Sequence, residues 1–172
     1  PGNSSPLTMT LTGPVDIVAQ FGQADPPISD GFTSCELGTF WSYSDPVGDT
    51  SFAQNEGSLS ISIPSGTSHD LWSDANGDFR LAPRMTQSIM NTNFEIEVKF
   101  DSIPSERFQI QGIVVEQDAD NLMRFDFYHD GENLQLFAAP FADGNSFVDG
   151  PYPVTVIPSG PSLYMRVSRQ GN

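Results

Sequence analysis

Residues 94–100 read FEIEVKF, and this segment decides the fold class. Its apolar side chains occupy every second position, which is the period of a β-strand with one face on a core. The same alternation recurs in residues 58–63 and 122–128, and turn-forming residues separate such segments. Helical periodicity is nearly absent from the chain. The sequence therefore predicts an all-β protein in which two antiparallel sheets pack face to face.

Further strands are expected along the chain, at the spacing of a sandwich or barrel. They cover residues 7–11, 15–21, 40–43, 108–115, 134–139, 154–157 and 163–167. The segment 108–115 is more continuously apolar, which is the pattern of a central strand buried on both faces. One core is expected to contain Phe94, Ile96, Val98, Ile113, Val115, Phe125 and Phe127.

The chain is strongly acidic. Its 172 residues include 22 Asp and Glu against 7 Lys and Arg, which gives a formal net charge of -15. Binding to phosphates needs basic residues, so the charge excludes an electrostatic nucleic-acid partner and disfavours anionic membrane surfaces. No apolar stretch approaches the roughly 20 residues that span a bilayer. An acidic surface is also typical of secreted proteins from saline habitats, and it needs no acidic active site.

A linker and a lone cysteine bear on the organisation of the chain. Residues 22–27 have linker composition, because their prolines stiffen the backbone and cannot donate ladder hydrogen bonds. We expect a domain boundary there.

Cys35 has no second cysteine to pair with, so neither a disulfide framework nor a thiolate metal site is predicted.

From Ile28 onward the chain resembles the concanavalin-A-like lectin/glucanase superfamily, and within it the LamG-like domains of large extracellular bacterial proteins. The matching segments are SDGF (29–32), APR (82–84), FEIEV (94–98), QGIVV (111–115), DADNLMRF (118–125) and LYMRV (163–167). The resemblance implies a jelly-roll β-sandwich that is secreted or lies at the cell surface. It also implies a polysaccharide or other glycan as ligand and neighbouring domains of a parent protein as partners.

Residues 1–21 separately resemble the end of a small β-repeat of bacterial cell-wall proteins, through LTMTL (7–11) and IVAQF (17–21). Together the resemblances divide the chain into residues 1–24, a repeat tail plus linker, and residues 25–172, the jelly-roll domain. In the family, a further hairpin and a final strand follow the strand matched at 163–167. We therefore expect an incomplete sandwich with an open strand edge, which a second chain, a neighbouring copy or other residues of this chain would complete.

Catalytic motifs are not found. Hydrolases of the concanavalin-A-like superfamily carry Glu-x-Asp-x-x-Glu on one strand, and this sequence lacks that motif. Glu95 and Glu97 alternate on one strand, which is the usual pattern of a solvent-facing surface. Ser68, His69 and Asp70 are contiguous, so their side chains cannot converge as a nucleophilic triad. No catalytic residue is predicted, and a glycan-active enzyme with a different site stays as an alternative.

A strip of polar and aromatic side chains is the first candidate ligand site. Arg124, Asp126 and Tyr128 alternate along one strand and so share one face. They would offer a guanidinium donor, a carboxylate acceptor and an aromatic edge to a sugar. The alternative is an Arg124–Asp126 ion pair on a solvent-facing surface.

A polar loop is the second candidate ligand site. His69 and Asp70 precede Trp72, and an exposed Trp offers a flat stacking surface to the apolar face of a pyranose. The alternative places Trp72 in the core. Trp41, which follows Phe40 at a predicted strand, is expected to be a core residue.

Calcium is the metal to consider, because oxygen ligands abound and soft ligands do not. Asp74, Asn76 and Asp78 resemble the first half of an EF-hand loop, but no Glu follows at the distance that such a loop requires. An ordinary Asn-Gly hairpin explains the segment as well. Asp30 is a further candidate ligand, by resemblance to the structural calcium of the superfamily.

These observations favour a non-catalytic carbohydrate-binding or adhesion module of an extracellular multidomain protein. A glycan-active enzyme of the same fold and a structural spacer without ligand are the alternatives. Assays of binding and hydrolysis on one polysaccharide panel would separate the three.

Overall fold

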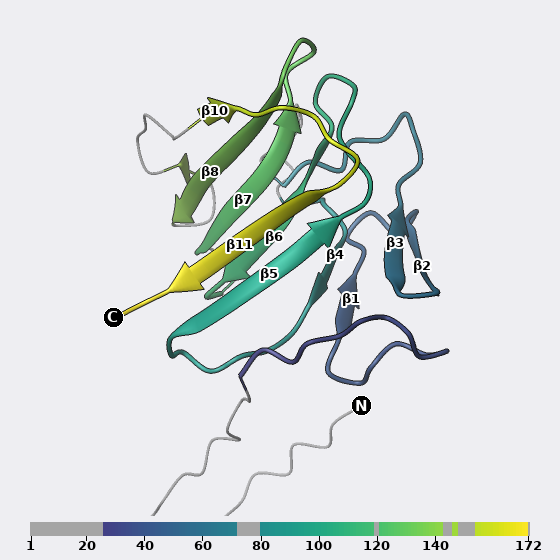
Figure 1. The fold of residues 1–172 in the computed structure, drawn as a ribbon, viewed down its shortest axis with the longest axis vertical. Coiled ribbons are helices and arrows are strands. Elements are labelled where there is room, and N and C mark those ends of the chain that lie inside the picture. The colour runs from purple at the N-terminus through teal and green to yellow at the C-terminus, as the bar shows by residue number, and fades with distance from the viewer. Residues whose placement is uncertain (1–25, 72–79, 119–120, 143–145, 148–153, 172) are drawn as a thin grey trace, which may run out of the picture.

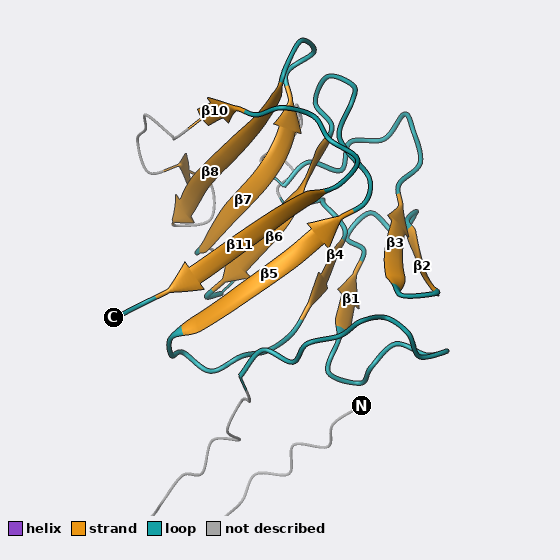
Figure 2. Cartoon of the chain, viewed as in Figure 1, coloured by secondary structure: helices purple, strands orange, loops and turns teal. Residues whose placement is uncertain are grey.

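The computed structural model describes residues 26–71, 80–118, 121–142, 146–147 and 154–171 (Figure 1). This part of the chain contains strands and loops but no helix, so the predicted all-β class is confirmed (Figure 2). The strands are β1 Ser42–Ser44, β2 Ser51–Asn55, β3 Ser58–Ser62, β4 Arg84–Thr86, β5 Phe94–Phe100, β6 Ile110–Glu116, β7 Leu122–His129, β8 Leu134–Ala142, β9 Ser146–Phe147, β10 Val154–Val156 and β11 Leu163–Arg169. Within these residues no helix is long and apolar enough to cross a membrane.

The largest sheet is antiparallel and has the strand order β10-β8-β7-β6, with β9 on β8. A tight turn joins β7 and β8, the two central strands of this sheet, into a hairpin. The Asp130 carboxylate accepts the backbone N–H groups of Glu132 and Asn133 at 2.8 and 2.7 Å. Gly131 supplies a φ of 107°, which residues with side chains rarely adopt.

The prediction of a central strand at 108–115 is wrong. β6 begins at Ile110 and ends the described order of its sheet, whereas β7 and β8 are central. Among the residues of β6 only Ile113 is buried. A continuous apolar run therefore did not distinguish a central strand from an edge strand, because the strand order depends on pairing far along the chain.

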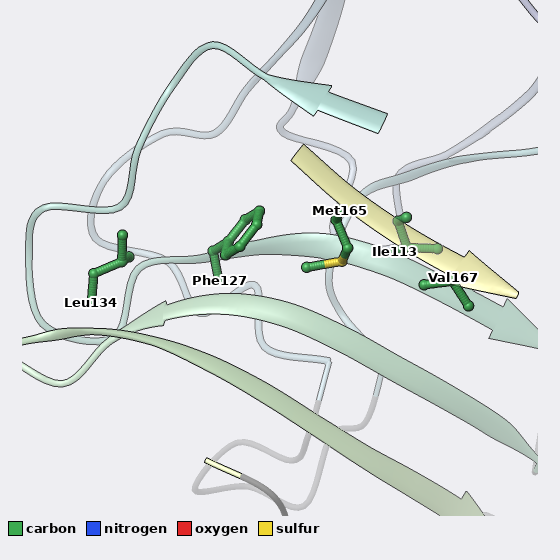
Figure 3. Packing of buried hydrophobic residues seen from close by; sticks show 5 residues of the cluster. All are labelled: Ile113, Phe127, Leu134, Met165 and Val167. Atoms are coloured by element: carbon green, nitrogen blue, oxygen red, sulfur yellow. The ribbon is translucent and has the colours of Figure 1, made fainter. Parts of the chain in front are cut away.

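A two-stranded sheet of β5 and β11 lies across the larger sheet (Figure 1). Between the two layers is a core of five buried side chains, Ile113, Phe127, Leu134, Met165 and Val167 (Figure 3). Partly buried residues pack against it, and the rings of Phe100 and Phe127 meet edge to face at 5.6 Å. The two layers are consistent with a β-sandwich.

The expected core is confirmed for Phe94, Ile96, Ile113, Val115, Phe125 and Phe127, which all belong to this cluster. The expectation for Val98 is wrong, since Val98 is 37% exposed. Its alternation with Ile96 places it on the inner face, but β5 pairs only with β11 among the described strands. A side chain on such a narrow sheet has neighbours on one side only.

β11 pairs with β5 from Leu163↔Phe100 to Arg169↔Phe94. No other described strand pairs with β11, so the second edge of this strand is open within the described residues. Two small sheets, β1–β4 and β2–β3, lie beside the main layers (Figure 1). Glu56 and Gly57 both have positive φ, the pattern of the two-residue hairpin turn that joins β2 to β3.

Candidate functional site

The face of the large sheet that points away from the β5–β11 pair is here called the distal face. It carries Arg124, Asp126 and Tyr128 of β7, since Phe125 and Phe127 on the same strand belong to the core. The predicted common face of the three residues is therefore confirmed. The strand pairing adds two cross-strand rows to it, Gly112–Asp126–Phe137–Val154 and Ile110–Tyr128–Gln135–Val156.

Arg124 and Asp126 form a buried ion pair. Arg124 Nε donates to Asp126 Oδ2 at 2.5 Å, and the two residues are only 2% and 5% exposed. The Arg124 guanidinium also lies 5.6 Å from the ring centroid of Phe137. The ion pair named as the alternative to a sugar-binding strip is thus present, but it does not face solvent.

Gly112 leaves room for the Asp126 carboxylate on the neighbouring strand. A Cβ atom at this position would lie 2.8 Å from Asp126 Oδ1 and 2.0 Å from the carbonyl oxygen of Phe125. Neither distance is compatible with normal van der Waals contact. The close approach of the β7 backbone, together with the Asp126 carboxylate, therefore requires the glycine of the QGIVV segment.

The environment of Asp126 shifts its acidity. Burial raises the pKa of Asp126 to about 6, although Arg124 opposes the shift. The negative charge of Asp70 adds to the increase in the pKa, which places this loop residue close enough to influence the distal face. Burial thus raises the pKa of one carboxyl group of this face above the ordinary value of 3.8.

The predicted loop site is only partly described. His69 Nε2 contacts Asp49 Oδ1 at 2.7 Å and Nδ1 contacts the carbonyl oxygen of Thr67 at 3.0 Å, so both ring nitrogens have partners in the protein. The carbonyl oxygen of Asp70 accepts from Leu81 N at 2.8 Å. Trp72 lies outside the described residues.

The predicted calcium ligands are likewise divided. Asp30 uses both carboxylate oxygens within the protein, since Oδ2 accepts from Trp41 Nε1 at 2.9 Å and Oδ1 accepts from Phe32 N at 2.8 Å. Trp41 is half-buried, and its ring stacks on the ring of Phe32 with the centroids 5.8 Å apart. Asp74, Asn76 and Asp78 lie outside the described residues. In the part of the chain that the structure describes, no cluster of three or more His, Cys, Asp or Glu could hold a metal ion.

Arg84, from the APR segment, has a local structural role. Its Nη1 donates to the carbonyl oxygens of Ala82 and Arg80 at 3.2 and 3.3 Å, and its Nε lies 3.0 Å from Glu116 Oε1. Arg80 also pairs with the same carboxylate. These contacts tie the segment before β4 to the end of β6.

The row Ile110–Tyr128–Gln135–Val156 was missed from sequence apart from Tyr128. Ile110 and Val156 are exposed, whereas Tyr128 and Gln135 between them are half-buried. Alternation alone could not select these residues, because the row exists only through the pairing of four strands. Chemically, the row offers apolar contacts, a phenol and an amide on one surface.

Comparison of the chain with protein-family models, with curated proteins and with solved structures finds no match.

Proposed function

We propose that the protein is a non-catalytic carbohydrate-binding or adhesion module with a jelly-roll fold of the concanavalin-A-like type. The observation that carries this proposal is the row Ile110–Tyr128–Gln135–Val156 on the distal face. Secretion or attachment to the cell surface, neighbouring domains and a second chain at the open edge of β11 belong to the same proposal.

The row has the composition that sugar recognition needs. A pyranose presents an apolar C–H face to aromatic and aliphatic side chains, while its hydroxyl groups need hydrogen-bond partners. Tyr128 supplies both a ring and a hydroxyl. The Gln135 Nε2 already donates to Asp130 Oδ2 at 2.5 Å, so Gln135 supplies its Oε1 as an acceptor. Four adjacent strands span about 14 Å, enough for two or three sugar units.

Removal of the Tyr128 side chain tests this function. We expect Tyr128→Ala to weaken binding to a soluble polysaccharide about tenfold, since such a ring contact contributes about 1–2 kcal/mol. Tyr128→Phe should retain most of the affinity, because it keeps the ring. Affinity electrophoresis on a panel of glycans measures the change, with Tyr164→Ala on the outer face of β11 as the control. Unchanged binding by Tyr128→Ala would exclude the row as the site.

A glycan-active enzyme is the second candidate, supported by the buried carboxyl group of Asp126, whose pKa burial raises to about 6. A protonated carboxyl group can act as a general acid near neutral pH. Release of reducing sugar ends from the same panel tests this candidate, and Asp126→Asn should abolish it. The absence of both binding and hydrolysis would favour a structural spacer. A structural Ca²⁺ at Asp74, Asn76 and Asp78 stays a prediction.

A further inference from the structure

The turn that leads into β6 carries an exposed aromatic side chain on a strained backbone. Phe108 has a φ of 69°, in the left-handed region that bulky L-residues rarely adopt. It is the third residue of a turn closed by a 3.0 Å hydrogen bond from Gln109 N to the carbonyl oxygen of Glu106. Where φ is positive at this position of a turn, Gly or Asn is the usual residue.

The same residue lies in a β-bulge. Phe108 N donates to the carbonyl oxygen of His129 at 2.9 Å, and His129 N donates to that of Gln109 at 3.1 Å. Phe108 and Gln109 therefore both lie opposite His129 of β7. In the bulge type with a left-handed first residue, that residue is normally Gly. Phe108 thus occupies a position where both the turn and the bulge favour glycine.

Burial of the ring does not compensate this strain, because Phe108 is 67% exposed. The backbone is held instead by the Gln109 side chain, whose Oε1 accepts the N–H groups of Ser105 and Glu106 at 2.9 and 3.1 Å. Strained residues that their surroundings hold in place occur preferentially at binding sites. A large ring kept in solvent at such a position indicates that the ring itself is used.

Arg107 adds hydrogen-bond donors to this feature. Its guanidinium carbon lies 4.6 Å from the Phe108 ring centroid, and its aliphatic chain passes close to Gly131 in the β7–β8 turn. Within the described residues Arg107 has no carboxylate partner, unlike Arg80, Arg84, Arg124 and Arg166. Its N–H groups are therefore available to a ligand at the edge of the ring, whose other face Arg107 does not cover.

We propose that Phe108 and Arg107 form a stacking platform for a neutral glycan. This inference rests on the proposed function and names the ligand class. The apolar face of a pyranose would lie on the face of the Phe108 ring that Arg107 leaves open, and hydroxyl groups beyond the ring edge would accept from Arg107. The net charge of -15, with Asp130 and Glu132 in the adjacent turn, opposes an anionic glycan.

The platform adjoins the row proposed above. Ile110 pairs with Tyr128 and follows Phe108 by two residues, so Phe108 and Tyr128 lie at the same end of the sheet. The platform and the row therefore lie at one end of the large sheet.

Variants that remove the ring but suit the backbone test the proposal. Phe108→Gly and Phe108→Asn both tolerate positive φ, so their melting temperatures should equal or exceed that of the wild type. Their affinity for a neutral polysaccharide should fall about tenfold. Isothermal titration with laminarin, yeast mannan and galactomannan measures the affinity, and polygalacturonate serves as the anionic comparison. Glu56→Gly, a matched change at another residue of positive φ, should bind like the wild type.

Undiminished binding by both ring-less variants would overturn the platform and leave the proposed function standing. Loss of binding together with lower melting temperatures in both would also overturn it, because that result indicates a structural role. A preference for polygalacturonate would overturn the neutral ligand class. Failure of the wild type to bind any of the polysaccharides would overturn the platform and the proposed function together. Phe108→Trp gives a second readout, since its fluorescence should shift when the polysaccharide binds, and an unchanged spectrum during binding would contradict the proposal.

Discussion

The carboxylate of Asp126 is buried beside Arg124 at a cost that depends on pH. Removing both charges from water is expensive, and their mutual attraction offsets this cost only in part. Burial raises the pKa of Asp126 to about 6, which shows that the attraction to Arg124 does not fully offset the cost of burying the carboxylate. The protein retains the pair together with Gly112, whose missing side chain leaves space for the carboxylate. This arrangement fixes one residue of β6 opposite one residue of β7.

A pH dependence of stability follows from this residue. The folded pKa of about 6 lies above the ordinary value of 3.8, so the folded state binds the proton more tightly. The stabilising contribution of protonation is fully present below pH 3.8 and is lost as the pH rises through 6. We expect up to about 3 kcal/mol of unfolding free energy to be lost over this window. Urea denaturation from pH 4 to pH 8 measures it, and Asp126→Asn should lack this loss. Equal pH profiles for the wild type and Asp126→Asn would show that Asp126 does not titrate in this range.

At the scale of elements, the strands could be predicted where alternation was strong. The predicted strand at 94–100 is confirmed at both ends, and the one at 122–128 extends by one residue, to His129. The short strands β2, β4 and β9 were not predicted, because each contains only one large apolar residue and so shows no period. Alternation also grouped Arg124, Asp126 and Tyr128 correctly. It could not predict their burial, which depends on how segments distant in sequence pack.

The packing of β11 on the large sheet gives a prediction for this element. Met165 is buried in the core between the two layers, whereas Tyr164 beside it is exposed. Met165→Ala should lower the unfolding free energy by about 2–5 kcal/mol, because it leaves a cavity. Tyr164→Ala is the control and should change it by less than about 0.5 kcal/mol. Chemical denaturation measures both, and equal effects of the two variants would mean that β11 does not pack on β6 and β7 as described.

At the scale of the whole molecule, charge repulsion acts against the compact state. With 22 acidic and 7 basic residues, the chain has about three carboxylates for each cationic side chain. The exposed ion pairs, Lys99 with Asp101 and Arg166 with Glu97, contribute little in water. Long-range repulsion among the remaining carboxylates is therefore the larger electrostatic effect on stability.

Salt should consequently stabilise the protein. The screening length falls from about 30 Å at 0.01 M salt to about 10 Å at 0.1 M, which weakens repulsion across the molecule more than it weakens close ion pairs. We expect the melting temperature to rise by several degrees between 0.01 and 0.5 M NaCl at pH 7.5, where Asp126 is already ionised. KCl at the same ionic strength is the control, because screening does not depend on the identity of the cation. A melting temperature that falls with salt would mean that local ion pairs, rather than the net charge of -15, dominate the electrostatics of the fold.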